Sequence, residues 1–506
     1  MKIETRAFLA GVSAVTLALA ACGGGGGGGS STPTPPVATP PPPPPPPAGS
    51  DETDITVQGP IQGFGSVIVN GVRYNTDDAT VVVDGETKSL EDLSVGQIVA
   101  LRATRSGDGE LPTALRVRYE ESLEGPVEAI SADRNRITIL GIEVVVTEDT
   151  VFEDDLDPDT ISVDDVLEVS GSFASETELV ASYIEESDDF DSDYEVHGTV
   201  GALDTDAQTF RVRGLKISYA NAVLEGFDGL ELANGLKVEV EGSTFTNDGT
   251  LNAAVVEYEG DDFDEFDGED GDEAEIEGLV NGFVSDTEFF VGDIAVTTTS
   301  QTEYERGSAA DLADGVRIEV EGEFNGEGVL VADEIKFEFE ANVRVTADVD
   351  AVDLDARTLT VLGLTFDIED MTKFRDKRRE RVREFGLDDT AVDDYVSVRA
   401  FELADGTLLA KRVERNECDD DDRQDEGCVE LRGFVDANAA DAFVVQDIEV
   451  IFDDRTEFEY EEEDLSRDAF LARIAVGDYV KIEGEETEDG QVLAREVEFE
   501  REDDED

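Results

Sequence analysis

The sequence has very few of the residues on which active sites and metal centres commonly depend. His197 is its one histidine, so a centre built from several histidines is excluded, and a Ser-His-Asp triad would depend on that residue alone. The chain contains no Gly-x-Ser-x-Gly turn, no phosphate-binding loop ending in Gly-Lys-Ser/Thr and no Cys-x-x-Cys. His197 itself lies in a strand pattern where a surface or barrel-rim position is ordinary. We therefore assign no catalytic residue and expect a protein that is not an enzyme.

Basic residues are also scarce. Lysine and arginine together number 38 against 125 acidic residues, which gives a formal net charge of -87. A protein that binds nucleic acid needs a broad basic surface to neutralise phosphates, so nucleic acid is excluded as a partner. The same excess of carboxylates is compatible with binding of divalent cations.

One basic cluster stands out against this acidic background. It consists of Arg375, Lys377, Arg378, Arg379, Arg381 and Arg383. Acidic residues alternate with these side chains, which favours a solvated helix face with internal salt bridges. The alternative is a docking patch for an acidic neighbouring module or an anionic glycan.

Long apolar runs are absent except for Ala7 to Leu19, which is too short to span a bilayer. Lys2 and Arg6 precede this run, and Leu19-Ala20-Ala21-Cys22 follows it, so the start of the chain resembles a lipoprotein signal ending in a lipobox. This resemblance implies that residues 1–21 are removed and that Cys22 carries the lipid anchor. Gly23 after the cysteine favours the outer membrane, on its periplasmic or its outer face. The alternative is an ordinary signal peptide cut near Ala21.

Residues 22–54 have the composition of a tether. Gly23 to Gly29 is an unbroken glycine run, which is flexible, and Pro40 to Pro47 is an unbroken proline run, which favours extended polyproline II. We expect a disordered hinge followed by a stiff spacer between the lipid and the folded part.

The rest of the chain repeats one unit. The clearest copies are Gly235 to Gly242, Gly315 to Gly322 and Gly477 to Gly484, each an alternating apolar and charged strand followed by a turn and a Leu-x-Ala-like strand. Alternation of this kind is typical of strands with one buried face, and Asp-Gly or Asn-Gly between two such strands indicates a hairpin. We place six units and an acidic tail, at 55–122, 123–187, 193–260, 274–340, 341–417, 428–502 and 503–506.

Each unit has the element order of a small barrel. A strand near a glycine, two short strands and a Thr-x-aromatic signature such as Thr372 to Phe374 come before the hairpin. In two copies the segment between the third and fourth strands has helical spacing, at Thr372 to Phe385 and Leu465 to Ile474. Five strands with a helix between the third and fourth is the order of the OB fold. The sequence predicts an all-β protein of tandem five-stranded OB-like barrels, although a small sheet with another strand order fits nearly as well.

The repeated strands, turns and Leu-x-Ala segments resemble the bacterial family catalogued as domain of unknown function 5666, over roughly residues 55–502. The resemblance implies a β fold and an envelope location, and it implies no activity.

Cysteine and acidic segments supply the remaining candidate sites. Cys418 and Cys428 are predicted to form a disulfide in an exported protein, with two free thiols as the alternative. The acidic linkers contain weak candidate ligands for Ca²⁺, although solvated disordered linkers are the simpler interpretation. The candidates are Asp189, Asp191, Asp193, Asp262, Asp264, Asp267, Asp419 and Asp421.

These observations favour a lipid-anchored envelope protein that presents OB-like modules as a spacer or surface-interaction scaffold, without a cofactor. The alternative is an adhesin-like protein that binds divalent cations, Ca²⁺ among them, or envelope glycans. A row of exposed aromatic side chains on one barrel face would favour glycan binding.

Overall fold

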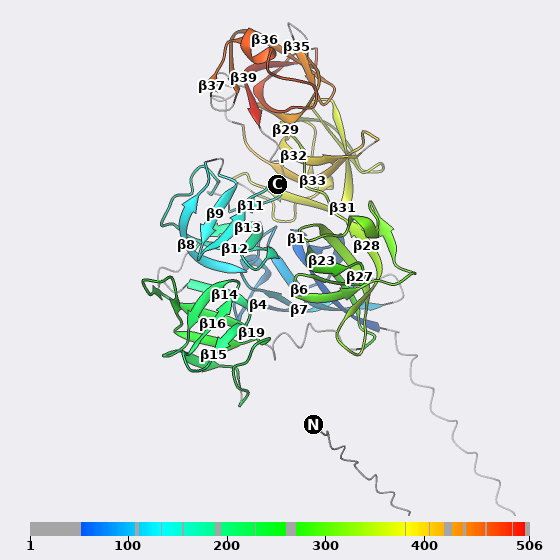
Figure 1. The fold of residues 1–506 in the computed structure, drawn as a ribbon. Helices are drawn as coiled ribbons and strands as arrows, with labels where there is room; N and C mark the ends of the chain where they lie inside the picture. The colour runs from blue at the N-terminus through cyan, green and yellow to red at the C-terminus, as the bar shows by residue number, and fades with distance from the viewer. Residues whose placement is uncertain are drawn as a thin grey trace, which may run out of the picture. The chain divides into compact units, whose positions relative to one another are not determined.

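Short stretches in which apolar and charged residues alternate form the strands, because successive side chains of a strand point to opposite faces. Along β19 (Lys237–Gly242), Val238 and Val240 are fully buried, whereas Glu239 and Glu241 lie on the opposite face. The computed structural model describes residues 52–106, 111–132, 134–153, 156–187, 194–227, 229–259, 270–379, 381–403, 405–418, 428–438, 442–460, 463–487 and 489–500. Nearly all regular structure within these residues is β-strand (Figure 1), which confirms the all-β prediction.

The first three modules follow one another along the chain. Module one contains β1 (Glu52–Gly63), β2 (Val67–Val69), β3 (Val72–Tyr74), β4 (Thr80–Val83), β5 (Glu86–Lys88), η1 (Leu90–Asp92), β6 (Ile98–Ser106) and β7 (Thr113–Tyr119). Module two contains β8 (Leu123–Ile130), β9 (Arg136–Ile139), β10 (Ile142–Val145), β11 (Val151–Phe152), β12 (Val166–Ser175) and β13 (Glu178–Glu186). Module three contains β14 (Tyr194–Thr199), β15 (Gly201–Asp204), β16 (Thr209–Val212), β17 (Leu215–Ser218), β18 (Val223–Glu225), β19, β20 (Thr244–Phe245), β21 (Leu251–Asn252) and β22 (Val255–Tyr258).

The last three modules repeat the arrangement with longer strands. Module four contains β23 (Glu273–Ser285), β24 (Glu288–Val291), β25 (Ile294–Thr297), β26 (Glu303–Glu305), η2 (Ala309–Asp311), β27 (Arg317–Phe324) and β28 (Leu330–Phe337). Module five contains β29 (Val343–Asp353), β30 (Thr358–Val361), β31 (Leu364–Asp376), η3 (Leu387–Asp389), β32 (Tyr395–Glu402) and β33 (Leu408–Arg415). Module six contains β34 (Val429–Asn438), β35 (Ala442–Val445), β36 (Ile448–Tyr460), β37 (Glu463–Asp464), α3 (Arg467–Leu471), β38 (Tyr479–Glu486) and β39 (Val492–Glu500).

Strand pairing closes each module into a barrel with the strand order of the OB fold. In module four, β23 pairs with β24 and β24 with β25, all antiparallel, and β25 then runs parallel to β28. The hairpin of β27 and β28 returns to β23 and closes the ring. Modules five and six have the same order, with β31 parallel to β33 and β36 parallel to β39. The prediction of tandem five-stranded OB-like barrels is confirmed, and the alternative strand order is wrong.

The glycine that ends the repeated fourth-strand pattern lies at a bulge. The pairing of β38 with β39 shifts register between Glu483 and Gly484, where a Cβ on the glycine would collide with the Leu493 carbonyl. Gly322 faces the Val331 carbonyl in the same way. Because glycine has no Cβ, the backbones of the two strands can approach closely there.

One of the two predicted helices is wrong and the other is shorter than predicted. The segment from Thr372 to Phe385 begins as strand, because β31 continues to Asp376 in parallel pairing with β33. The segment from Leu465 to Ile474 contains the short helix α3 (Figure 1). Its Phe470 is fully buried. Parallel pairing from Lys373 to Asp376 therefore overrides the helical spacing at the start of the Thr372 to Phe385 segment.

The first strand of each module also pairs with the first strand of another module. β8 pairs antiparallel with β14, and β29 with β34, which joins module two to three and module five to six. β1 runs parallel to β23, from Ile55 opposite Glu273 to Gln58 opposite Ile276. Modules one and four are not adjacent in the sequence, so module contacts are not limited to sequence neighbours.

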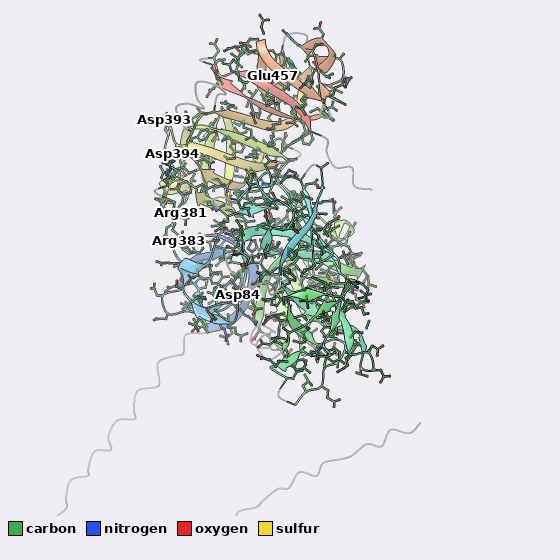
Figure 2. All side chains as sticks on the ribbon, turned by 90° about the vertical axis from the view of Figure 1, so that its left-hand side faces the viewer. Asp84, Arg381, Arg383, Asp393, Asp394 and Glu457 are labelled. Carbon is green, nitrogen blue, oxygen red and sulfur yellow. A yellow bond between two sulfur atoms is a disulfide. The ribbon has the colours of Figure 1, made fainter. Side chains whose placement is uncertain are left out.

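The basic cluster is not a helix face, and two of its arginines contact other modules. Arg375 Nη1 donates to the Phe152 carbonyl of module two at 2.5 Å. Arg383, labelled in Figure 2, donates to the Leu93 carbonyl of module one at 2.7 Å and stacks over Phe64. The cluster therefore supplies docking contacts between modules of the same chain.

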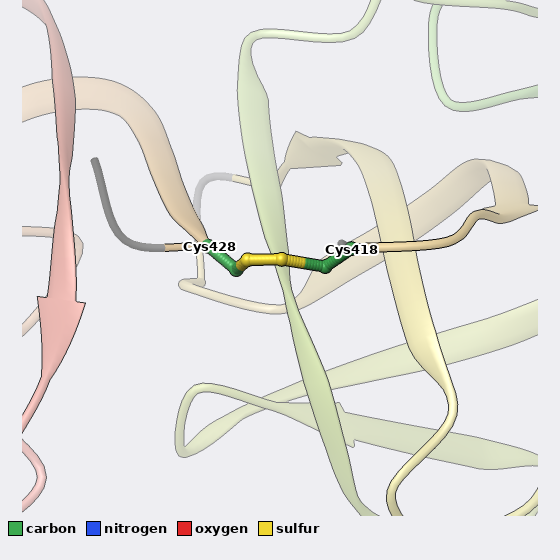
Figure 3. Close-up of a disulfide and its surroundings, with 2 residues drawn as sticks. All are labelled: Cys418 and Cys428. Carbon is green, nitrogen blue, oxygen red and sulfur yellow. A yellow bond between two sulfur atoms is a disulfide. The ribbon is translucent and has the colours of Figure 1, made fainter. Parts of the chain in front are cut away.

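A disulfide joins Cys418, which follows β33, to Cys428, which precedes β34 (Figure 3). The two Cα atoms are 6.3 Å apart. The bridge connects the end of module five to the start of module six, as the cysteine pattern predicts.

Candidate cation site

The single histidine lies between two carboxylates. His197 is on β14, and its side chain is 14 % exposed. Its Nε2 lies 2.7 Å from Glu195 Oε1, two residues earlier on the same face of the strand. Its Nδ1 lies 2.5 Å from Glu259 Oε1, just after β22. Both ring nitrogens therefore have a carboxylate partner within module three.

Module one adds a further carboxylate on the Nε2 side. Glu121 follows β7, is 5 % exposed, and its Oε2 has no hydrogen-bond partner. Glu121, Glu195 and His197 each offer one ligand atom, and these atoms lie within 4.8 Å of one another. A buried carboxylate oxygen without a partner carries a large desolvation cost, so this position needs a proton or a cation.

A second set of ligand atoms lies on the Nδ1 side. Glu120, His197 and Glu259 also have ligand atoms within 4.8 Å of one another. Glu120 is already paired, because Arg118 Nε donates to its Oε1 at 2.7 Å. The guanidinium therefore places a positive charge beside this second set of ligand atoms.

The imidazole also borders a cavity of about 170 Å³. Its lining includes Arg118, Glu120, Glu121, His197 and Arg213. Arg213 of module three stacks over Phe173 of module two, with 3.9 Å from Cζ to the ring centroid. The cavity is therefore bounded by side chains from several modules, and Glu120, Glu121 and His197 of the cluster line its wall.

Electrostatics in this cluster oppose full ionisation of its carboxyl groups. Burial raises the pKa of Glu121 well above its usual range, and the neighbouring carboxyl of Asp84 (Figure 2) raises it further. Burial and the charge of Glu195 raise the pKa of Glu239 to about 9. Burial alone would lower the pKa of His197, but Glu259 and Glu195 raise it well above its usual value. The cluster thus crowds carboxyl groups around one imidazole, and imidazole nitrogen with carboxylate oxygen is a ligand set that Zn²⁺ accepts.

Sequence reasoning treated His197 as an ordinary strand residue and missed this cluster. Its members come from strands and strand ends of modules one and three, and the carboxylates of module one lie 74 to 139 residues before the members in module three, without a motif spacing. The predicted Ca²⁺ ligands (Asp189, Asp191, Asp193, Asp262, Asp264, Asp267, Asp419 and Asp421) and the predicted lipidation site Cys22 lie outside the described residues.

Six OB-like barrels in tandem place the protein in the class of all-β repeat proteins. The chain belongs to the family described as Domain of unknown function (DUF5666), which matches residues 56–118, 124–185, 197–257, 277–336, 346–414 and 432–498. No curated protein matches the chain. A solved structure titled "drosophila Unr CSD456" is similar at 11 % identity, with 44 % of this chain and 97 % of that chain covered and a TM-score of 0.11. Among the residues that the structure describes, no helix has the length and apolar character needed to cross a membrane.

Proposed function

We propose that this chain is a non-enzymatic, lipid-anchored envelope protein that presents its OB-like modules as a spacer or surface-interaction scaffold. The observation that carries the proposal is the backbone pairing between modules, in which first strands join modules one and four, two and three, and five and six. Each of these pairings replaces an exposed strand edge by a shared sheet. Modules connected in this way favour presentation of a surface over independent motion of single domains.

Interfaces through buried arginine add to this support. Arg412 of module five is 2 % exposed and donates to the module-two carbonyls of Glu148 and Thr150 at 2.9 and 2.8 Å. A buried guanidinium that satisfies backbone carbonyls fixes the geometry of the contact, since its donors form a rigid planar fork. A scaffold requires such fixed contacts between its parts.

Fractionation of a Gram-negative host tests the anchoring. The full chain is expected in the outer-membrane fraction, whereas Cys22→Ala is expected in the soluble fraction of the envelope, because loss of the acyl chains removes the anchor. In vivo cross-linking of the full chain then tests the scaffold function. If the chain is a scaffold, we expect it to cross-link to a defined partner in the envelope. A soluble wild-type chain, or cross-linked products absent at every surface position, would contradict the proposal.

The second candidate function is binding of divalent cations, and the His197 cluster favours it. Glycan binding has weaker support. Among the described aromatic residues, Phe245 of module three and Phe290 of module four are exposed, and they lie in different modules without forming a row.

A further inference from the structure

We propose that His197, Glu195 and Glu121 form a binding site for a Zn²⁺-class dication that joins module three to module one. This inference goes beyond the scaffold function and does not depend on lipid anchoring. It rests on the placement of an imidazole nitrogen and two carboxylates around one point.

The strongest observation is the environment of Glu121. Glu121 is 5 % exposed, its Oε2 has no hydrogen-bond partner, and its carboxylate offers one ligand atom to the cluster. Water does not reach the Glu121 carboxylate at this depth to offset the cost of its desolvation, whereas the charge of a bound dication would offset it. The other two ligand atoms, His197 Nε2 and Glu195 Oε1, are already only 2.7 Å apart.

The Glu259 carboxylate orients His197 for metal binding through Nε2. The Glu259 carboxylate lies 2.5 Å from Nδ1, so Nδ1–H donates to Glu259. Nε2 faces Glu195 Oε1 at 2.7 Å, and a dication bound there would replace the proton between these two atoms while Nδ1 keeps its own. A carboxylate on the far nitrogen is the usual orienting partner of a metal-binding histidine, where it fixes the ring and increases its basicity.

The charge of Arg118 selects this side of the imidazole over the other. Glu120 could replace Glu121 if the metal bound Nδ1, but Arg118 is hydrogen-bonded to Glu120 and would repel a dication. Glu239, to which no guanidinium of the described residues donates, lies opposite His197 in the pairing of β14 with β19. The geometry therefore favours the site that contains Glu121.

The ligand types select the metal. Zn²⁺ accepts imidazole nitrogen and carboxylate oxygen at about 2.0 to 2.2 Å, in sites with three protein ligands and a water. Ca²⁺ is bound by six to eight oxygen ligands and does not favour an imidazole nitrogen. Ligand atoms within 4.8 Å of one another need only small side-chain rotations to reach zinc distances.

Calorimetric titration of Zn²⁺ into the full chain in mild detergent tests the site. The solution contains 150 mM salt and 5 mM Ca²⁺, which saturates weak surface carboxylates. We expect one tight equivalent of Zn²⁺ in the wild type and at least a tenfold loss of affinity in His197→Gln and in Glu121→Gln. Glu259→Gln is expected to weaken binding by about 10- to 100-fold, the usual range for an orienting partner. The matched control Glu120→Gln, one residue from Glu121, should keep the wild-type affinity.

Co²⁺ provides a second readout that does not depend on heat signals. A visible absorption band of Co²⁺ bound to nitrogen and oxygen should appear with the wild type and with Glu120→Gln, and disappear with His197→Gln. Near-ultraviolet circular dichroism without metal verifies that each variant is folded. Equal Zn²⁺ affinity in all variants overturns the proposal. So does a larger loss in Glu120→Gln than in Glu121→Gln, or displacement of Zn²⁺ by millimolar Ca²⁺.

Discussion

The hydroxyl of Thr372 donates to the carbonyl of Ala410 at 2.7 Å, and this one hydrogen bond connects two separate repeated signatures of the sequence. Thr372 begins the Thr-x-aromatic signature of the third strand, and Ala410 ends the Leu-x-Ala signature of the fifth. The same bond joins Thr302 to Ala332 at 2.7 Å and Thr456 to Ala494 at 2.8 Å. It lies where the parallel pairing of these two strands is interrupted by a register shift, as between Ile368 and Lys373. The hydroxyl thus bridges the interruption in the barrel wall.

Replacing Thr372 by valine should destabilise module five. Valine keeps the shape of the side chain but leaves the buried Ala410 carbonyl without its donor, which costs about 1 to 3 kcal/mol. Urea unfolding of the full chain, followed by tyrosine fluorescence, measures the change. The control is Thr365→Val, since Thr365 is exposed. Equal stability of the two variants would show that the hydroxyl contributes nothing.

Arg412→Met should weaken the contact of module five with module two. The substitution keeps most of the volume and removes the donors to the Glu148 and Thr150 carbonyls, so the expected loss is on the order of 3 kcal/mol. Backbone amides around β33 and β11 should exchange hydrogen faster in the variant than in the wild type. Amide exchange in module six should be unchanged. Arg455→Met, at an exposed arginine of module six, is the control. Unaltered exchange in both modules would contradict this role of Arg412.

Stability should fall as the pH rises from about 5 to 9, with a contribution from Glu275 on β23. Burial, followed by the charges of Glu319 and Glu321, raises the pKa of Glu275 to about 8. The positive charges of Arg105 and Lys336 lower this pKa but do not offset the increase. Tyr74 is a further neighbour of the Glu275 carboxyl. Because the folded-state pKa lies above the unfolded value, the stabilisation is complete below about pH 4.5 and is lost as the pH passes through 8.

The measurement is the melting temperature of wild type, Glu275→Gln and Glu323→Gln at several pH values. Glu275→Gln should lose less stability between pH 5.5 and 9 than the wild type does. Glu323 is exposed on the neighbouring strand β27, so Glu323→Gln removes one charge without removing a buried carboxyl. If both variants follow the same pH curve, the pH dependence arises from net charge and not from Glu275.

Removal of the disulfide should lower stability by about 2 to 3 kcal/mol in the chain-entropy model, because the bridge closes a loop of sequence separation 10. The double variant Cys418→Ser/Cys428→Ser, compared with the wild type by urea unfolding, measures the difference. Addition of a thiol reductant should reproduce the loss in the wild type and leave the double variant unchanged. A reductant effect of equal size in both would assign the loss to another cause.

The sequence alone determined the repeated architecture of this protein. Alternation such as that of Val238 and Val240 with Glu239 and Glu241 specifies a strand with one buried face, because the side-chain period of a strand is two. The Asp-Gly and Asn-Gly turns specify the hairpins, and the two cysteines in the whole chain apart from Cys22 specify one possible internal bridge. These are local properties, and they repeat six times, so each copy supports the others.

Only the tertiary structure decided the strand order, the module contacts and the candidate cation site. The apolar spacing of Thr372 to Phe385 suits a helix, yet β31 there gains parallel pairing with a strand some 40 residues later. His197 and Glu121 belong to different modules, and no local pattern connects them. Contacts of this kind depend on which barrel faces meet after the chain has folded, because each residue's local preference is small compared with the free energy of burying those faces.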